Sequence, residues 1–300
     1  MFQATPSSHA RRGRALPWRL GDRNRRTAAM IRHCRVTTVM VLALAVTAPA
    51  LAEQPLWELG LGAAALSLPH YRGSDQSYRW LLPVPFGVYR GQIFRATRDG
   101  ARAVLLESDR FDFDISLAAS PPVHSSDNLA RSGMPDLAAT VEIGPNLNLT
   151  LAHGAVGKLQ LRLPVRGVVA LGSGAGVIGW TASPALNLDL EVQGWNLGLQ
   201  GGPLAASRVN HAYYYDVAPA YATASRPAYS APGGLAGWRV TVGASRRFGS
   251  LWVGGFVRGD SLSGAVFDGS PLVRQRENFS CGLALSWVLV ASDTQVPDDR

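Results

Sequence analysis

Apolar and polar residues alternate along many segments of the chain, and this period of two constrains the fold more than any other feature. Clear cases are Phe111 to Leu117 and Lys158 to Arg166, which carry apolar side chains at every second position. Successive side chains of a strand point to opposite faces of a sheet, so each segment would have one apolar and one polar face. The same pattern covers 137–143, 147–151, 186–192, 195–199, 238–244, 251–257 and 279–289. We therefore predict an all-β fold.

Glycine, proline and asparagine stand where turns would separate these segments. The candidate turns are Asp99-Gly100, Gly144-Pro145-Asn146, Gly172-Ser173-Gly174, Gly201-Gly202-Pro203 and Gly233-Gly234. Beyond residue 52, no apolar run approaches the roughly 18 residues of a helical membrane span, and helix start and stop patterns are not evident.

The net charge of +8 is concentrated at the N-terminus. Of the 29 basic and 21 acidic residues, nine and one respectively lie in residues 1–52, which leaves 20 of each in residues 53–300. Most of the chain therefore lacks the basic field that captures nucleic acid, and no nucleic-acid partner is expected. Only Cys281 lies beyond this N-terminal segment, so one thiol cannot form an internal disulfide or a cysteine zinc site.

Residues 30–52 have the three parts of a secretory signal peptide in order. Arg32 and Arg35 precede an apolar run over 36–48, and Ala50-Leu51-Ala52 matches a cleavage site before Glu53. We predict export through this cleaved signal peptide. For residues 1–29 we favour an over-extended N-terminus, with translation starting at Met30, and a long positive region is the alternative.

Two architectures fit the alternation: a soluble sandwich of two sheets, and a closed antiparallel transmembrane β-barrel in the outer membrane of a Gram-negative cell. The barrel is favoured by segments of about 9–11 residues and by small residues on the polar faces. Aromatic residues near segment ends also fit interfacial girdles; these are Trp57, Trp80, Tyr89, Trp180, Trp195, Trp238, Trp252 and Trp287. We predict about 12 strands, with 10 to 14 allowed, over residues 53–290, and a C-terminal tail over 291–300.

Arg162 fixes which face of its strand would be turned to lipid. An arginine facing lipid at mid-membrane costs about 2–4 kcal/mol, so Arg162 should face the lumen and its leucine neighbours should face outward. The same reasoning predicts a lumen that holds charges of both signs. The residues expected to face it are Asp112, Asp114, Arg162, Asp189 and Glu191.

One tetrapeptide has the letters of a hydrolase signature. Gly259-Asp260-Ser261-Leu262 would need a histidine base for its serine, but no histidine follows His211 in the chain. We therefore interpret it as a strand-end turn. The histidines have no metal-ligand spacing, and the glycine-rich 172–176 lacks the context of a dinucleotide loop. We expect a non-enzymatic protein with no cofactor and no metal.

Four segments resemble the MltA-interacting protein family, also called MipA/OmpV. They span 69–75, 131–137, 214–234 and 258–273, and they occur in the order found in that family. The motif residues are Pro69, Tyr71, Gly73, Ser74, Asp75, Gly133, Met134, Asp136, Tyr215, Asp216, Pro219, Tyr221, Arg226, Pro227, Tyr229, Arg258, Asp260, Gly264, Phe267, Ser270 and Pro271. The similarity covers about residues 56–290, and it accounts for the hydrolase-like tetrapeptide as part of a family motif.

The resemblance implies an outer-membrane β-barrel scaffold in contact with outer-membrane lipid. Its implied partners are a lytic transglycosylase and a bifunctional penicillin-binding protein, so that the scaffold links a murein hydrolase to a murein synthase in cell-wall remodelling of peptidoglycan. Such partners would meet short periplasmic turns and the tail, whereas the long segments 121–136, 203–237 and 261–277 would be external or folded into the lumen. A small-solute channel or porin, and a surface adhesion or envelope-stress barrel, remain alternative functions.

Overall fold

The computed structural model describes residues 54–296, except 92–93, 98–99, 109 and 173–174. The chain divides into two compact units, 1–50 and 51–300, and the described residues all lie in the second. The predicted signal peptide over 30–52 and the predicted over-extension over 1–29 therefore lie outside the described residues.

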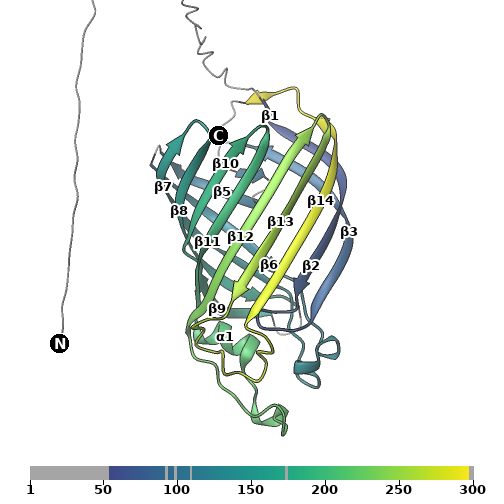
Figure 1. Cartoon of the computed structure of the whole chain (residues 1–300), viewed down its shortest axis with the longest axis vertical. Helices are drawn as coiled ribbons and strands as arrows, with labels where there is room; N and C mark the ends of the chain where they lie inside the picture. The colour runs from purple at the N-terminus through teal and green to yellow at the C-terminus, as the bar shows by residue number, and fades with distance from the viewer. Residues whose placement is uncertain (1–53, 92–93, 98–99, 109, 173–174, 297–300) are drawn as a thin grey trace, which may run out of the picture. The chain divides into compact units, whose positions relative to one another are not determined.

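The second unit is built almost entirely from antiparallel strands (Figure 1). The strands are β1 (Gln54–Pro55), β2 (Trp57–Pro69), β3 (Ser77–Arg90), β4 (Phe94–Thr97), β5 (Gly100–Glu107), β6 (Phe111–Ser120), β7 (Thr140–Gly154), β8 (Gly157–Ala170), β9 (Gly176–Ala182), β10 (Ala185–Val192), β11 (Trp195–Ala206), β12 (Gly234–Phe248), β13 (Leu251–Ser261), β14 (Glu277–Ala291) and β15 (Gln295–Val296). The helical elements are α1 (Arg208–Tyr215) and three 3-10 turns, η1 (Ser125–Asp127), η2 (Leu129–Arg131) and η3 (Pro219–Tyr221). In the part of the chain that the structure describes, no helix is long and apolar enough to cross a membrane.

Strands β2 to β14 form one large sheet of 12 strand positions. Strands β9 and β10 share one position, because both pair with β8 on one side and with β11 on the other, with Ser183 and Pro184 between them. All other neighbours in sequence pair with each other, and β14 also pairs with β2. The prediction of an all-β fold with about 12 strands is confirmed.

The two faces of the sheet carry opposite kinds of residue. Asp114 and Asn148 are 1% and 2% exposed on one face, which we call the inner face. On the other, outer face, large apolar residues such as Leu81, Leu283 and Phe279 are exposed. This distribution is the reverse of that in a soluble protein, where exposed faces are polar.

Two of the predicted turns were wrong. Gly144-Pro145-Asn146 lies inside β7, and Gly201-Gly202-Pro203 lies inside β11. A Cβ at Gly144 would lie 2.1 Å from the Val165 carbonyl oxygen, and one at Gly202 would lie 2.0 Å from that of Pro184. These glycines therefore allow a neighbouring strand to approach closely at irregular points of the ladder, rather than forming hairpins.

Two further predictions need correction. The predicted segment 137–143 begins too early, because β7 starts at Thr140 and Leu137 instead forms an isolated bridge with Val123. The prediction of an interfacial girdle is wrong for Trp80 and Trp252, because both occupy inner-face positions of their strands. Trp252 contacts Phe86 of β3 at a ring distance of 5.9 Å.

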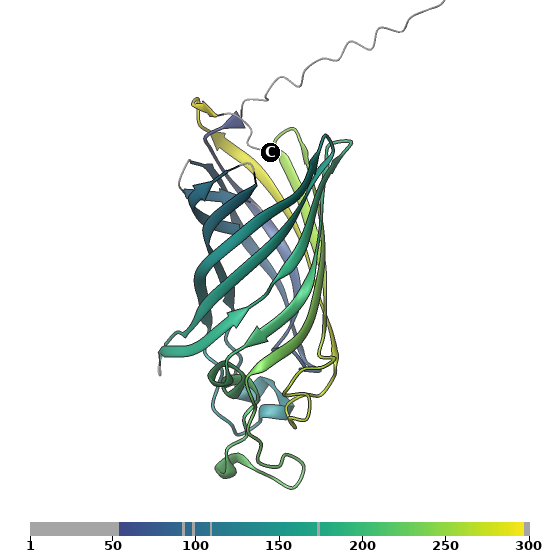
Figure 2. The ribbon, with the colours of Figure 1, turned by 90° about the vertical axis from the view of Figure 1, so that its left-hand side faces the viewer.

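The two ends of the sheet differ in the length of their connections. Two-residue turns join β7 to β8, β10 to β11 and β12 to β13 at one end, where β1 pairs with β15. The long connections, with α1, lie at the opposite end (Figures 1 and 2). The described part of the C-terminal tail thus lies beside the start of the described chain, at the short-turn end.

Candidate functional site: the loop cap

Four connections gather at one end of the sheet and pack against one another. We call residues 70–76, 121–139, 207–233 and 262–276 together the loop cap. Of the family-motif residues, all lie in the cap except Pro69, which ends β2, and Arg258 and Asp260, which lie near the end of β13. Motifs that are far apart in sequence are therefore neighbours in space.

An apolar core holds the cap together. Tyr71, Leu262 and Phe267 are buried in one cluster with residues of all four connections. The Phe267 ring stacks on Tyr215 with ring centroids 3.7 Å apart, and His211 meets the same ring edge-on at 4.6 Å. Aromatic pairs of this kind add to the stabilisation from burial itself. A second, smaller cluster contains Met134, Val217 and Leu272.

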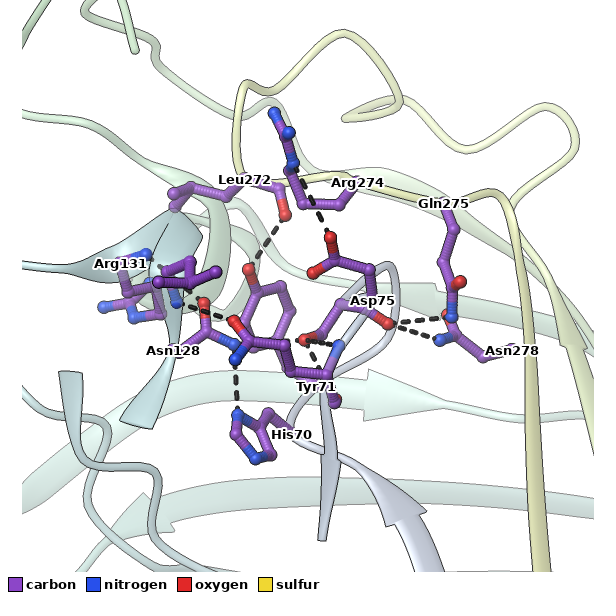
Figure 3. A network of polar contacts seen from close by, with 12 residues as sticks. His70, Tyr71, Asp75, Asn128, Arg131, Leu272, Arg274, Gln275 and Asn278 are labelled. Carbon is purple, nitrogen blue, oxygen red and sulfur yellow. Dashed lines mark hydrogen bonds and ion pairs between the residues drawn. The ribbon is translucent and has the colours of Figure 1, made fainter. Parts of the chain in front are cut away.

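The β2–β3 connection is anchored by backbone hydrogen bonds to distant residues (Figure 3). Gly73 adopts φ +93°, a conformation that favours glycine, and its N–H donates to the Asn278 side chain at 2.6 Å. The Gly73 carbonyl accepts from the N–H of Arg274 at 2.7 Å. Nearby, the Tyr71 hydroxyl donates to the Leu272 carbonyl at 2.9 Å. The first and fourth motif segments are thus joined, although about two hundred residues separate them.

Asn128 and Arg131 connect residues 121–139 of the cap to the neighbouring connections (Figure 3). The fully buried Asn128 amide contacts His70 Nδ1 and Ser74 Oγ, each at 3.1 Å. The buried Arg131 guanidinium donates to the carbonyls of Tyr214 and Pro135, and its burial lowers the pKa of Arg131. Buried polar groups of this kind are costly unless they are satisfied, so these contacts fix how the loops fit together.

Arg226 performs the same role for the third segment. Arg226 Nη1 donates to the carbonyls of Ala130 and Ser132, both at 2.9 Å. Arg226 Nη2 donates to the Tyr221 carbonyl, also at 2.9 Å. Asp216, the residue that follows α1, accepts from the Ala231 N–H at 2.6 Å. The third segment is therefore tied to the second and closed on itself.

The buried tyrosines of the cap serve as hydrogen-bond donors. Burial raises the pKa of Tyr71 and of Tyr214 to about 12, and it also raises the pKa of Tyr215. The Tyr215 hydroxyl donates to the Arg72 carbonyl at 2.9 Å. These groups stay protonated at neutral pH, and the contacts observed here are those of structural donors.

At its surface, the cap forms a shallow pocket of about 190 Å³ between the second and third motif segments. Met134, Asp136 and Tyr221 are among its lining residues. The Asp136 carboxylate also lies 3.0 Å from His124 Nδ1 and accepts from the Ser125 N–H at 2.7 Å. These hydrogen bonds lower the pKa of Asp136 to about 2 and raise the pKa of His124.

Below the cap, three arginines surround the aspartate of the hydrolase-like tetrapeptide. Asp260 Oδ1 accepts from Arg72 Nε at 3.0 Å and from Arg239 Nε at 2.9 Å, and Arg258 Nε lies 3.4 Å from Oδ2. The following Ser261 ends β13 and donates to Glu277 at 2.7 Å. The tetrapeptide lies at the end of β13 as expected, but the predicted turn is wrong, because Gly259, Asp260 and Ser261 are still part of the strand.

Four of the five residues predicted to face a lumen contact polar residues of the inner face, in two groups. Asp114 accepts from Asn146 and Asn148 across the β6–β7 pair, and Lys158 Nζ lies 3.8 Å from Asp112. Arg162 Nη2 lies 3.3 Å from Asp189 across the β8–β10 pair. Glu191 is exposed near the β10–β11 turn. Charges of both signs therefore do lie on the inner face.

Sequence reasoning missed several residues that organise the site. Asn128, Asn278 and His211 are each at most 2% exposed and hold loops together, yet none lies in the quoted motifs. Their signal in the sequence is weak, because a lone polar residue in a loop does not reveal whether it is buried.

The sequence model of the family "MltA-interacting protein MipA" matches residues 61–289, so the chain belongs to this family. Membership supports an outer-membrane barrel protein. No curated protein matches the chain.

Solved structures give weaker likenesses. A structure described as a bacterial polysaccharide outer membrane secretin is 7% identical with a TM-score of 0.38, over 79% of this chain and 99% of that one. A structure of Pseudomonas aeruginosa OccK2 (OpdF) in complex with glucuronate is 14% identical with a TM-score of 0.18, over 68% of this chain and 65% of that one. Likeness at this level carries no argument about function.

Proposed function

We propose that the second unit is a closed, 12-stranded transmembrane β-barrel of the outer membrane. The pairing of β14 with β2 supports closure, as does the pairing of the β9–β10 position with both β8 and β11. The exposed apolar residues of the outer face fit contact with lipid, and the buried polar residues of the inner face fit a lumen. Export would use the signal peptide predicted over 30–52. N-terminal sequencing of the mature protein tests this, and we expect it to begin at Glu53.

The long connections would then face the cell surface and the short turns the periplasm, as in other outer-membrane barrels. The loop cap would be external, and the described termini would be periplasmic. Murein lies on the periplasmic side, so a partner that works on murein would meet the short-turn end rather than the cap.

The function that family membership supports best is a non-enzymatic scaffold, which would join a murein hydrolase to a murein synthase in cell-wall remodelling. The name of the matching family, MltA-interacting protein, supports this proposal. A lytic transglycosylase and a bifunctional penicillin-binding protein would be the partners. At the short-turn end, Arg246 lies over the rings of Trp195 and Phe248, at 5.7 Å and 4.9 Å from their centroids. This cluster lies on the outer face at the rim of the short-turn end, where a partner held at the membrane surface would contact it.

Crosslinking in intact cells tests the scaffold. We expect a transglycosylase and a penicillin-binding protein to copurify with the wild type, and the double substitution Trp195→Ala with Arg246→Ala to reduce their recovery several-fold. A substitution at the exposed cap tip, Ala224→Ser, is the matched control and should leave recovery unchanged. Absence of both enzymes from the wild-type sample would contradict the scaffold.

A surface-contact role is the second candidate, and the position of the motif residues favours it. They gather in the cap, which would be external, and the pocket lined by Met134 and Asp136 opens there. In the same experiment, loss of a partner on changing the cap but not the short-turn end would favour surface contact. A steady ion conductance in planar bilayers would instead favour a channel.

A further inference from the structure

The hydrogen-bonded ladder is incomplete between β3 and β6. Strand β3 pairs with β4 only at Tyr89 and Arg90, and β5 pairs with β6 only over 112–116. Within the described residues, β3 over 77–88 and β6 over 117–120 therefore have no strand partner on the sides that face each other. Two strand positions lie between them, which corresponds to roughly 14 Å at about 4.8 Å per spacing.

Two prolines mark β3 as an open edge. Pro83 and Pro85 are two residues apart, so the sides on which they lack an N–H are the same. Pairing of β3 with β2 runs through both prolines without a register shift, which places the missing donors on the open side. Proline is confined to such edges because it cannot donate to a ladder, and it also disfavours addition of another strand there.

The inner face next to this edge is apolar. Trp80, Leu82, Val84 and Phe86 alternate along the inner face of β3, and Leu82 is 41% exposed. This is unlike β7 and β8, where Asn146, Asn148 and Gln160 are buried on the inner face. One side of the interior is therefore lined by apolar side chains and the other by polar ones.

A cationic cluster lies near the apolar side. Arg72, Arg239 and Arg258 share the single carboxylate of Asp260, which leaves an excess of positive charge. Arg72 Nη2 is buried and has no hydrogen-bond partner among the described residues. Such a group is costly to bury, and a bound anion would satisfy it.

The strand register places the cationic cluster and the apolar residues in two neighbouring rows across the inner face. Arg239, Asp260 and Asn278 form one row across β12, β13 and β14. Four residues further along the strands, Phe256, Gly282, Leu66 and Trp80 form a row across β13, β14, β2 and β3. Four residues of strand span roughly 13 Å. An acyl chain of this length would therefore reach from a head group at the first row to the apolar residues of the second row.

We propose that the barrel binds a single-chain amphiphile with a carboxylate head, of the fatty-acid class. The head would lie against Arg72, Arg239 and Arg258, which already hold one carboxylate, and the acyl chain would follow Leu66, Trp80 and Leu82. The unpaired side between β3 and β6 would be its route to and from the lipid. This inference rests on the membrane barrel proposed above, whose ring of strands is complete near the short-turn end but unpaired between β3 and β6 toward the cap. It does not rest on the scaffold role.

Binding of laurate to the full chain in a neutral detergent, followed by native mass spectrometry, tests this proposal. We expect saturable binding of one laurate, at least tenfold tighter than binding of dodecanol, which has the same chain without charge. Equal affinity for laurate and dodecanol would overturn the assignment of the head.

Three variants locate the ligand. The double substitution Arg239→Gln with Arg258→Gln keeps the ion pair of Arg72 with Asp260 and should weaken laurate binding about tenfold. Leu82→Asn should weaken it through the chain. Arg162→Gln, which removes an inner-face arginine from the polar side, is the matched control. The site would be overturned if Arg162→Gln weakened laurate binding as much as the double substitution does. It would also be overturned if the double substitution, or Leu82→Asn, left laurate binding unchanged.

Gel mobility separates failure of this proposal from failure of the barrel. A closed barrel should migrate differently before and after boiling, in the wild type and in each variant compared. A wild type without this shift would contradict the barrel and the site together. A normal shift without selective laurate binding would contradict the site alone.

Discussion

Phe267 in the loop cap is 1% exposed, whereas Phe279 on the outer face of β14 is 73% exposed. The cap hides its large apolar side chains from water, as a soluble domain does. The sheet instead places apolar residues outside and buries carboxylates and amides, such as Asp114 and Asn148, inside. This difference is the one expected if water surrounds the cap and lipid surrounds the sheet, as in the membrane barrel proposed above.

We expect the largest difference in stability between alanine substitutions of these two phenylalanines. Phe267→Ala removes a fully buried ring that stacks on Tyr215, so it should destabilise the cap by about 3–5 kcal/mol. Phe279→Ala should have a much smaller effect, because its side chain packs little against protein. Hydrogen exchange of cap and strand amides measures both, and equal effects of the two substitutions would contradict the comparison.

Two exposed leucines, one on the sheet and one in the cap, differ in the surroundings that their side chains would meet. Leu283 on the outer face of β14 is 56% exposed, and Leu129 in the cap is 82% exposed. Leu283→Arg would place a charge in lipid and should cost about 2–4 kcal/mol, whereas Leu129→Arg faces water and should cost little. Unfolding in urea from lipid vesicles, followed by gel mobility, measures the difference. Tolerance of both substitutions would argue against lipid contact by the sheet.

Asn128 tests the polar part of the cap. Asn128→Ala leaves the buried Ser74 hydroxyl and His70 ring without this amide partner, and we expect a local loss of about 1–3 kcal/mol. Ser126→Ala, at an exposed neighbour, is the control. Faster exchange should be confined to cap amides; uniform loss of protection across the strands would contradict a separately stabilised cap.

The smallest expected effect is a pH dependence confined to the cap. Burial lowers the pKa of His211, whose Nδ1 lies 2.7 Å from the Pro232 carbonyl. The folded pKa lies below the unfolded value of about 6.5, so its stabilising effect is complete above that value and is lost as the pH falls below it, by at most about 1.4 kcal/mol per pH unit. Cap protection should fall from pH 7.5 to pH 5.5, and the fall should be smaller in His211→Gln. An unchanged pH dependence in that variant would exclude His211 as a cause.

The sequence predicted the sheet better than the cap, for a physical reason. Alternation is local, so Lys158 to Arg166 already indicated a strand with Arg162 on its polar face. Strand β3 defeats this logic, because both faces of Leu81-Leu82-Pro83-Val84-Pro85-Phe86 are apolar. The cap depends on contacts such as the bond from Tyr71 to Leu272, which join loops about two hundred residues apart. No local pattern encodes that pairing, although the family resemblance did identify the segments that form it.

The central claim is that the motif-bearing cap and the short-turn end lie on opposite sides of the outer membrane. Single cysteines at exposed positions, Ala224→Cys in the cap and Ser250→Cys in the β12–β13 turn, test it in a chain in which Cys34 and Cys281 are replaced by serine. A membrane-impermeant maleimide should label the cap cysteine in intact cells, and the turn cysteine only after the outer membrane is permeabilised. Labelling of the turn cysteine in intact cells, with the cap cysteine protected, would contradict the account.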